Sequence, residues 1–150
     1  MKLNRGQIFN FVVDGRFFAI AQLPEAEGDT SKFDVICISA EKGMTPIQFE
    51  KKFITALGDK PKRDGVSRYQ QFKTLVEKRC EGGKSVVFIT KNAELLTPKA
   101  LRIVKPMSEA SNKSLEASAE VGFIFEGNMS IFKKVVAKEK DIELRMDIKE

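Results

Sequence analysis

Two apolar stretches of this sequence decide its fold: Phe33–Ser39 (FDVICIS) and Ser85–Thr90 (SVVFIT). Each stretch is short, rich in β-branched and aromatic residues, and flanked by polar or glycine-containing segments, which is typical of a β-strand. Both are close to continuously apolar, so they predict strands that are buried on both faces, as in a parallel sheet. Parallel neighbours need a long crossover between them, and the segment that joins these two is long enough to hold helices.

That crossover carries two helix signals. Thr45, Pro46 and Gln48 have the pattern of an N-cap, a first-turn proline and a capping box, and Gly58 marks the end of this helix after Leu57. The buried face of this helix is expected to consist of Ile47, Phe53, Ile54 and Leu57. Ser67–Gln70 repeats the capping pattern and predicts a second helix, which ends at Gly82-Gly83. Its inward residues are expected to be Tyr69, Phe72, Val76 and Cys80.

The segment before Phe33 has a less certain pattern. Ile8–Val13 (IFNFVV) predicts a first strand, and Asp14-Gly15 after it is typical of a tight hairpin turn. Arg16–Leu23 fits either a returning strand or a short helix, and the pattern leaves both open. Pro24–Ser31 is polar and predicts a loop.

Five further segments follow Thr90. They are a short helix from Thr97 to Val104 that Pro106 limits, a polar loop with a helical turn over Met107–Ala119, a strand over Glu120–Phe125, a helix over Met129–Ala137, and an edge strand in which Ile142, Leu144, Met146 and Ile148 alternate with polar residues. The whole order is one strand followed by repeated helix–strand units. We therefore expect residues 1–150 to form a single α/β domain, a three-layer sandwich with a largely parallel central sheet of about five strands.

The composition excludes several chemistries. The chain contains no histidine, which removes Ser-His-Asp catalysis, Cys-His catalysis and every histidine-ligated metal site. Its two cysteines do not form a CxxC motif; Cys37 is expected to be buried in its strand, and Cys80 to lie at a helix end. No apolar run approaches the roughly 20 residues that a membrane helix needs, so we expect a cytoplasmic protein.

Positive charge is concentrated in the middle third of the chain. Residues 51–100 carry 12 basic and 5 acidic side chains, a net charge of +7, whereas residues 1–50 carry a net charge of −2 and residues 101–150 are neutral. Such a surface can bind phosphate backbones without reading their sequence. The candidate nucleic-acid-binding residues are Lys51, Lys52, Lys60, Lys62, Arg63 and Arg68.

Four stretches after residue 32 follow one another as they do in a known family. They read FDVICISAEKGMTPIQFEKKFITALG, SRYQQFKTLVEKRCEGGKSVVFIT, TKNAELLTPKALRIV and VGFIFEGN. Their succession resembles the AAA-type ATPase core of secretion and transposition ATPases, and the similarity covers most of the chain. The resemblance implies family-equivalent positions at Arg16, Thr90, Lys91, Asn128 and Arg145, with Asn128 as the polar sensor residue and Arg145 as the arginine of the last helix and strand.

The departures from that family are specific. Its members need a glycine-rich loop ending in Lys-Ser/Thr after the first strand, because the loop amides cradle phosphates and the hydroxyl holds magnesium. Here the first predicted strand runs into the turn Asp14–Phe17, and Gly28–Lys32 has some of the residue types in the wrong order. Thr90 and Lys91 replace the acidic pair, and Glu94 is the nearest acid. We therefore expect no nucleotide or metal cofactor.

Three functions remain as hypotheses. The first is a non-catalytic binding or accessory protein on a degenerate ATPase-like scaffold, which contacts a protein partner such as an intact ATPase or a second copy of itself. The second is a small DNA- or RNA-binding accessory protein that uses the basic middle third. The third is a carboxylate-dependent, nuclease-like enzyme, for which Glu139–Asp141 and Glu41-Lys42 are the nearest fragments.

Overall fold

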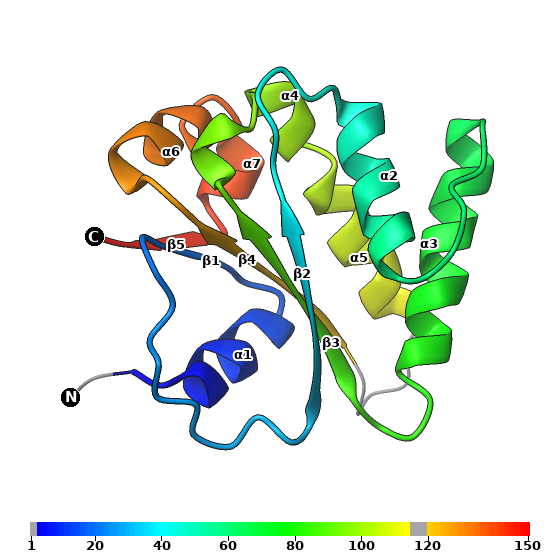
Figure 1. The fold of residues 1–150 in the computed structure, drawn as a ribbon, viewed down its shortest axis with the longest axis horizontal. Helices are drawn as coiled ribbons and strands as arrows, with labels where there is room; N and C mark the ends of the chain where they lie inside the picture. The colour runs from blue at the N-terminus through cyan, green and yellow to red at the C-terminus, as the bar shows by residue number, and fades with distance from the viewer. Residues whose placement is uncertain (1–2, 115–119) are drawn as a thin grey trace.

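A computed structural model describes residues 3–114 and 120–150, and its five strands form one all-parallel sheet (Figure 1). The strands are β1 (Phe17–Ile20), β2 (Phe33–Ser39), β3 (Ser85–Lys91), β4 (Val121–Glu126) and β5 (Met146–Lys149). Their order across the sheet is β2-β3-β4-β1-β5, so the first strand lies between the last two. The expected α/β sandwich with a parallel sheet of about five strands is confirmed.

Helices lie on both faces of the sheet, but very unequally. The helices are α1 (Arg5–Val13), α2 (Pro46–Ala56), α3 (Gly65–Arg79), η1 (Ala93–Leu95, a 3₁₀ turn), α4 (Pro98–Leu101), α5 (Val104–Ser114), α6 (Met129–Val136) and α7 (Lys140–Glu143). In Figure 1, α1 lies on one side of the sheet and the remaining helices lie on the other. Among the described residues, no helix is both long and apolar enough to cross a bilayer.

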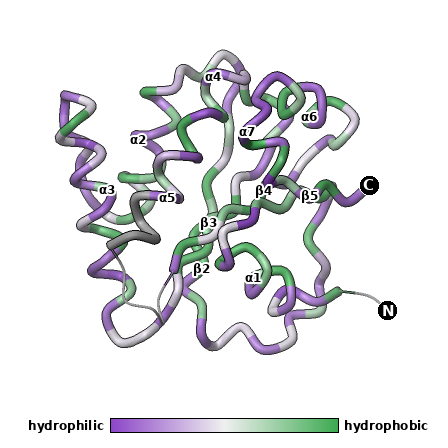
Figure 2. Tube along the Cα trace, turned by 180° about the vertical axis from the view of Figure 1, so that it is seen from behind, coloured by the Kyte–Doolittle hydropathy of each residue, from purple (hydrophilic) through white to green (hydrophobic). Residues whose placement is uncertain are grey.

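Phenylalanine rings form the centre of the larger core. Phe53 of α2 contacts the rings of Phe88 and Phe123 edge-on, at centroid distances of 5.1 and 5.7 Å. Phe72 of α3 packs against both Phe53 and Phe88. Each such pair contributes about 0.5–1.5 kcal/mol beyond the burial of its area. In Figure 2 the central strands run mostly through hydrophobic residues, whereas hydrophilic and hydrophobic residues alternate along the helices.

A smaller core lies between the sheet and α1. Ile8, Phe9 and Val12 of this helix are buried against Phe18 of β1 and Ile124 of β4, together with further residues of β2 and β3. The helix lies so close to β4 that a Cβ atom at Gly122 would be 2.4 Å from a methyl group of Val12. α1 is therefore the helix that shields this face.

The predicted first strand over Ile8–Val13 is wrong, because these residues belong to α1. Asn4 and Gln7 form a reciprocal capping box that starts the helix. Asp14 caps its end and Gly15, at φ +88°, turns the chain into β1, so the expected hairpin is absent. The apolar residues of this stretch are strand formers, but burial of one helical face against the sheet outweighs that preference. Arg16–Leu23, whose pattern fits either a strand or a short helix, contains β1.

The boundaries of β2 and the start of α2 are confirmed, including the capping box of Thr45 and Gln48. Two expectations about burial there are wrong. β2 is an edge strand with alternating burial, so Cys37 is exposed rather than buried. Ile47 is 52% exposed, and Phe49 takes its place in the core.

Three boundaries later in the chain also differ from expectation. Asp64, not Ser67, caps α3, so this helix begins one turn earlier than predicted. Pro106 falls in the first turn of α5, a position where proline is tolerated, so the helix runs on to Ser114 where a loop was expected. The remainder of the predicted loop, residues 115–119, lies outside the described residues. The expected final strand is divided into α7 and the edge strand β5, with Leu144 exposed between them.

Candidate functional site

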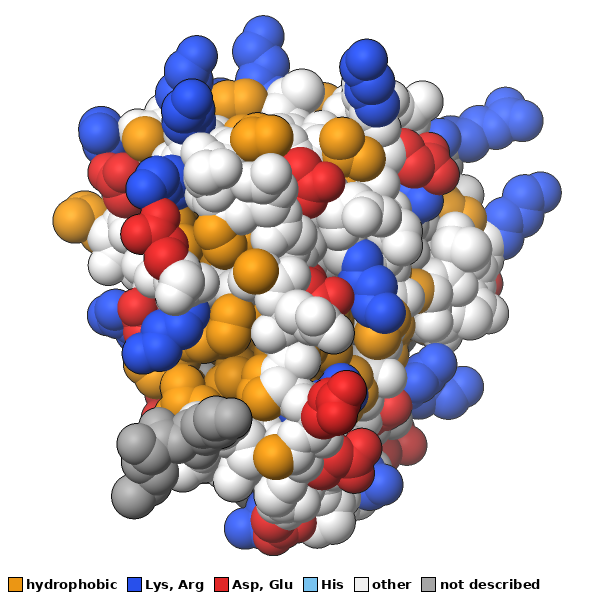
Figure 3. Space-filling model, turned by 60° about the vertical axis from the view of Figure 1, so that its left-hand side comes forward, with side chains coloured by type: hydrophobic (Ala, Val, Ile, Leu, Met, Phe, Trp, Pro, Cys, Tyr) orange, Lys and Arg blue, Asp and Glu red, His pale blue; other side chains and the backbone are white. Residues whose placement is uncertain are grey.

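In a parallel α/β sheet, ligands bind outside the carboxyl ends of the strands, at the point where the strand order reverses. Thr90, Lys91 and Asn128 all lie at this edge, at the ends of β3 and β4. Figure 3 shows the surface near this edge at the top of the view, where apolar side chains lie between lysines and arginines.

Glu94 forms a hydrogen bond between two segments at this carboxyl edge. Asn92, in a left-handed conformation at φ 57°, turns the chain after β3 into η1. The Oε1 atom of Glu94 then accepts a hydrogen bond from the backbone N–H of Asn128, at 3.0 Å. The approach is possible because residue 127 is glycine: a Cβ atom there would lie 2.1 Å from this oxygen. The carboxylate of Glu94 therefore links η1 to the start of α6, and we call such a carboxylate–backbone contact a latch.

Glu126 forms a second latch of the same kind. Its Oε2 atom accepts a hydrogen bond from the backbone N–H of Leu23, at 2.8 Å, and Leu23 is buried. The N–H of Gly127 donates to the carbonyl of Ile20 at 3.3 Å, which ties the end of β1 to the end of β4. Glu94 and Glu126 thus each bind a backbone amide of the protein itself.

The three residues flagged by sequence at this edge have different environments. Asn128 caps α6, as its side-chain oxygen accepts from the N–H of Ile131 and from the hydroxyl of Ser130. Thr90 is 1% exposed, and its hydroxyl has no hydrogen-bond partner among the described residues. Lys91 is exposed, and its carbonyl accepts from the N–H of Ala40 at 2.8 Å. In the part of the chain that the structure describes, no side chain is hydrogen-bonded to the Thr90 hydroxyl to act as a general base for it.

Arg16 and Arg145 lie at the opposite, amino edge of the sheet, just before β1 and β5. Arg145 is half-buried: its guanidinium lies 4.4 Å from the centroid of the Phe17 ring, and its Nε donates to the carbonyl of Gly15 at 3.0 Å. Burial lowers the pKa of Arg145, and the neighbouring carboxylate of Glu109 opposes that shift. Arg16 is exposed. The structure therefore does not bring these two arginines together with Thr90, Lys91 and Asn128.

The segment that follows β1 is where the resembled family would carry its phosphate loop. The turn Asp14–Phe17, which was assigned to that place, in fact precedes β1 and lies at the amino edge. The segment that does follow β1, residues 21–32, contains no helix and leads directly into β2. Within it, the carbonyls of Ala26 and Glu27 accept the N–H groups of Arg5 and Gly6 at the start of α1. This segment therefore lacks the loop-and-helix arrangement that binds phosphate.

The basic residues of the middle third do not act as one set. Arg68 is only 4% exposed: its Nε lies 2.5 Å from Glu50 Oε1, and its Nη1 donates to the carbonyls of Lys62 and Arg63. Arg68 therefore fastens the loop between α2 and α3 and is removed from the candidate phosphate-binding set. Lys52 is partly exposed and pairs with Glu41 at 3.0 Å. The exposed members of the set are Lys51, Lys60, Lys62 and Arg63.

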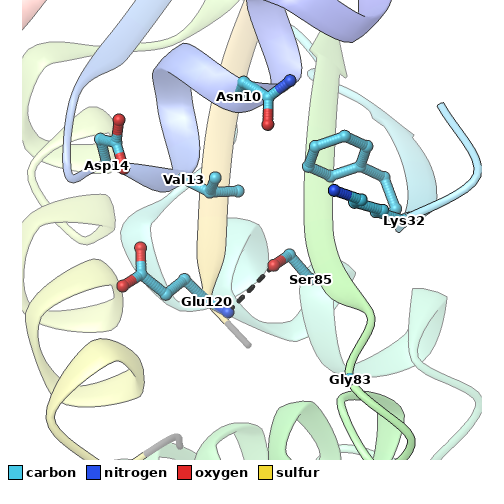
Figure 4. A pocket seen from close by; sticks show the side chains of 8 residues that line it. Asn10, Val13, Asp14, Lys32, Gly83, Ser85 and Glu120 are labelled. Atoms are coloured by element: carbon cyan, nitrogen blue, oxygen red, sulfur yellow. Dashed lines mark hydrogen bonds between the residues drawn. The ribbon is translucent and has the colours of Figure 1, made fainter. Parts of the chain in front are cut away.

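A small polar pocket lies at the amino edge beside α1 (Figure 4). Asp14 and Glu120 lie on one side of it and Lys32 on the other, with Asn10 above. The N–H of Glu120 donates to the hydroxyl of Ser85 at 3.2 Å. Burial, and to a lesser extent the charge of Asp14, raises the pKa of Glu120. Sequence reasoning missed this pocket, because α1 was predicted as a strand.

The fragments considered for a nuclease-like site lie in surface ion pairs. Glu139 accepts hydrogen bonds from Nε and Nη2 of Arg102, Asp141 pairs with Lys105 at 2.8 Å, and Glu41 pairs with Lys52. Within residues 3–114 and 120–150, no cluster of three or more acidic or cysteine side chains could hold a metal ion. The sequence matches no protein-family model, and a comparison with curated proteins gave no match.

Proposed function

We propose that this chain is a non-catalytic binding protein on a degenerate AAA-type ATPase scaffold, and that it acts through protein–protein contacts. The position of β1 supports the scaffold. AAA-type cores have their first strand between the fourth and the fifth, and the order β2-β3-β4-β1-β5 is the same. The Rossmann and flavodoxin-like orders of parallel α/β folds differ from it.

The observation that carries the non-catalytic part of the proposal is the pair of carboxylate latches. Glu94 is the acid nearest to Thr90 and Lys91, where the resembled family positions magnesium and water, and Glu126 ends the neighbouring strand. Each accepts a backbone N–H of this chain. The helix that follows the first strand in the family is missing here, and α1 precedes β1 instead.

The surface of the carboxyl edge supports a role in protein contacts. Leu95 of η1 and Ile131 of α6 are 37% and 47% exposed, and these two elements contact each other. We propose that these two side chains form part of an apolar contact with a partner at this edge.

A capture experiment from the native host tests the protein-contact part. The tagged chain and its Leu95→Ser/Ile131→Ser variant are compared, with Leu144→Ser as the matched control because Leu144 is 78% exposed and lies apart from this edge. We expect a partner that the wild type and the control retain and the double variant loses. Equal capture by all three would remove the carboxyl edge as the binding surface.

Isothermal titration with Mg·ATP tests the non-catalytic part. We expect no saturable heat and no phosphate release. Micromolar binding accompanied by turnover would overturn the proposal.

Nucleic-acid binding is the second candidate, and the loop between α2 and α3 favours it. Three of the four exposed basic residues, Lys60, Lys62 and Arg63, lie within this loop. If these four basic residues bind phosphates, a plot of the logarithm of the DNA affinity against the logarithm of the salt concentration should have a slope of about −3 to −4. A variant with all four changed to Gln should lose binding, whereas Lys133→Gln/Lys134→Gln, on the exposed side of α6, should not. No binding at low salt excludes this function.

A further inference from the structure

β2 leaves one long backbone edge of the sheet unpaired. Within the described residues its seven residues pair with β3 on one side only. In Figure 1, β2 is the strand nearest the viewer, and no other segment passes in front of it. The N–H and C=O groups along the outer side of an edge strand are a template for another strand.

This edge also lacks the devices that usually protect such strands. β2 contains no proline, and its single charged residue, Asp34, is paired with Arg79 at 2.9 Å. The opposite edge is different, because β5 has four residues and two of them, Asp147 and Lys149, are charged. Pairing is therefore expected at β2 rather than at β5.

Apolar side chains are exposed along the same strand. Val35 is 39% exposed, and Cys37, two residues on, is exposed on the same α1 side of the sheet. A strand added at this edge would cover part of both. The opposite side of β2 borders a hollow of about 420 Å³ between the end of the strand and α2, lined by residues that include Ile38, Lys51 and Lys52.

We propose that the occupant of this edge is a second copy of the chain, whose β2 pairs antiparallel with β2 about a two-fold axis at Ile36. Antiparallel pairing brings the basic start of one strand, at Lys32, beside the acidic end of the other, at Glu41. Directly opposite residues of an antiparallel pair have their side chains on the same face of the sheet, whereas successive residues of one strand alternate between the two faces. The two-fold axis must therefore place one residue opposite its own counterpart, here Ile36 opposite the partner's Ile36. The result is one continuous sheet of ten strands.

The charges and the apolar residues select Ile36 as the centre. This register places Val35 opposite the partner's Cys37 on the exposed face, twice by symmetry. On the other face, the partner's Asp34 lies opposite Ile38, beside the hollow whose charged lining residues are Lys51, Lys52 and Glu41, with a positive excess. A centre at Cys37 would instead place Val35 opposite the partner's Ser39, which replaces an apolar pair with an apolar–polar one.

This inference deepens the proposed function by naming a partner, and it rests on that function only in assigning the chain a role in protein contacts. Light scattering coupled to size exclusion, over a range of concentrations, measures the oligomeric state. We expect a dimer for the wild type and a monomer for Val35→Lys, with circular dichroism to show that the variant is folded. Val66→Lys is the control, since Val66 on α3 is 77% exposed and should leave the dimer intact. A monomeric wild type overturns the inference, whereas nucleotide turnover would overturn the proposed function instead.

Oxidative cross-linking tests the register. Directly opposite residues have Cβ atoms about 4.5–5.5 Å apart, whereas diagonal neighbours are about 7–8 Å apart, which is too far for a disulfide without backbone movement. Val35→Cys should therefore form an intermolecular disulfide with the partner's Cys37. The wild type and the Val35→Cys/Cys37→Ser variant, in which the thiols are diagonal, should form none. A cross-link in either of these two would contradict a centre at Ile36.

Discussion

Gly127 is the residue on which the carboxyl edge depends most directly. Its φ of 155° and the closeness of Glu94 both disfavour any side chain. We expect Gly127→Ala to lower the free energy of unfolding by roughly 2–3 kcal/mol, measured by urea titration, because it combines backbone strain with displacement of the latch. Gly43→Ala is the control, since its φ is +75° but nothing lies within 4 Å of the added atom. Equal losses in the two variants would show that the contact with Glu94 contributes nothing.

Cys80 is expected to be the slow-reacting thiol. It caps α3, is 6% exposed, and burial raises the pKa of its thiol. The folded protein therefore holds this proton more tightly than the unfolded chain, and the associated stability is lost as pH rises above the ordinary value for a thiol. Alkylation of the two single-cysteine variants at pH 8 should be much faster for Cys37 than for Cys80 until urea is added. Similar rates in the folded state would show that Cys80 is accessible.

Glu120 gives a pH-dependent prediction at the amino edge. Its raised pKa means that the folded state binds the proton more tightly, so stability falls as pH rises from the ordinary glutamate value through the folded value. Glu120→Gln should therefore raise the melting temperature at pH 7 and leave it nearly unchanged below the ordinary glutamate pKa. Glu25→Gln, in the exposed loop after β1, controls for the loss of one negative charge. A shift of the same size at both pH values would exclude this cause.

At the scale of elements, α1 stands apart because it is the one described helix on its face of the sheet. Asn4→Ala removes half of its capping box and should cost about 1 kcal/mol of unfolding free energy. Hydrogen exchange should become faster in α1 and stay unchanged in α2. Thr45→Ala, which removes the equivalent cap of α2, should produce the reverse pattern. Unchanged exchange in α1 after loss of Asn4 would mean that the cap does not hold this helix.

The elements also show what sequence reasoning could reach. The limits of β2 and the start of α2 could be predicted because local signals, an apolar run and a capping box, agree with the tertiary context. α1 was predicted wrongly because IFNFVV favours a strand locally, and only packing against the sheet makes it helical. The exposed face of β2 could not be predicted either, since continuous apolar content does not distinguish an edge strand from a central one.

The candidate site was predictable in position but not in chemistry. Thr90, Lys91 and Asn128 could be placed at the carboxyl edge from the order of the strands. The roles of Glu94 and Glu126 could not, because their partners, Asn128 and Leu23, are 34 and 103 residues away in the sequence. Such contacts depend on which strands become neighbours, and the sequence pattern does not specify that.

At the scale of the whole molecule, the central claim is the proposal that the carboxyl edge binds no nucleotide and that Glu94 and Glu126 there contact the protein's own backbone. The backbone amides of Leu23 and Asn128 report directly on it, since they donate to Glu126 and Glu94. Their ¹H–¹⁵N signals should move in the Glu126→Gln and Glu94→Gln variants, respectively, which identifies them as reporters of the two latches. The decisive measurement is a titration of the wild type with Mg·ATP, followed by these two signals. We predict that neither signal moves; a saturable shift of both would contradict the account.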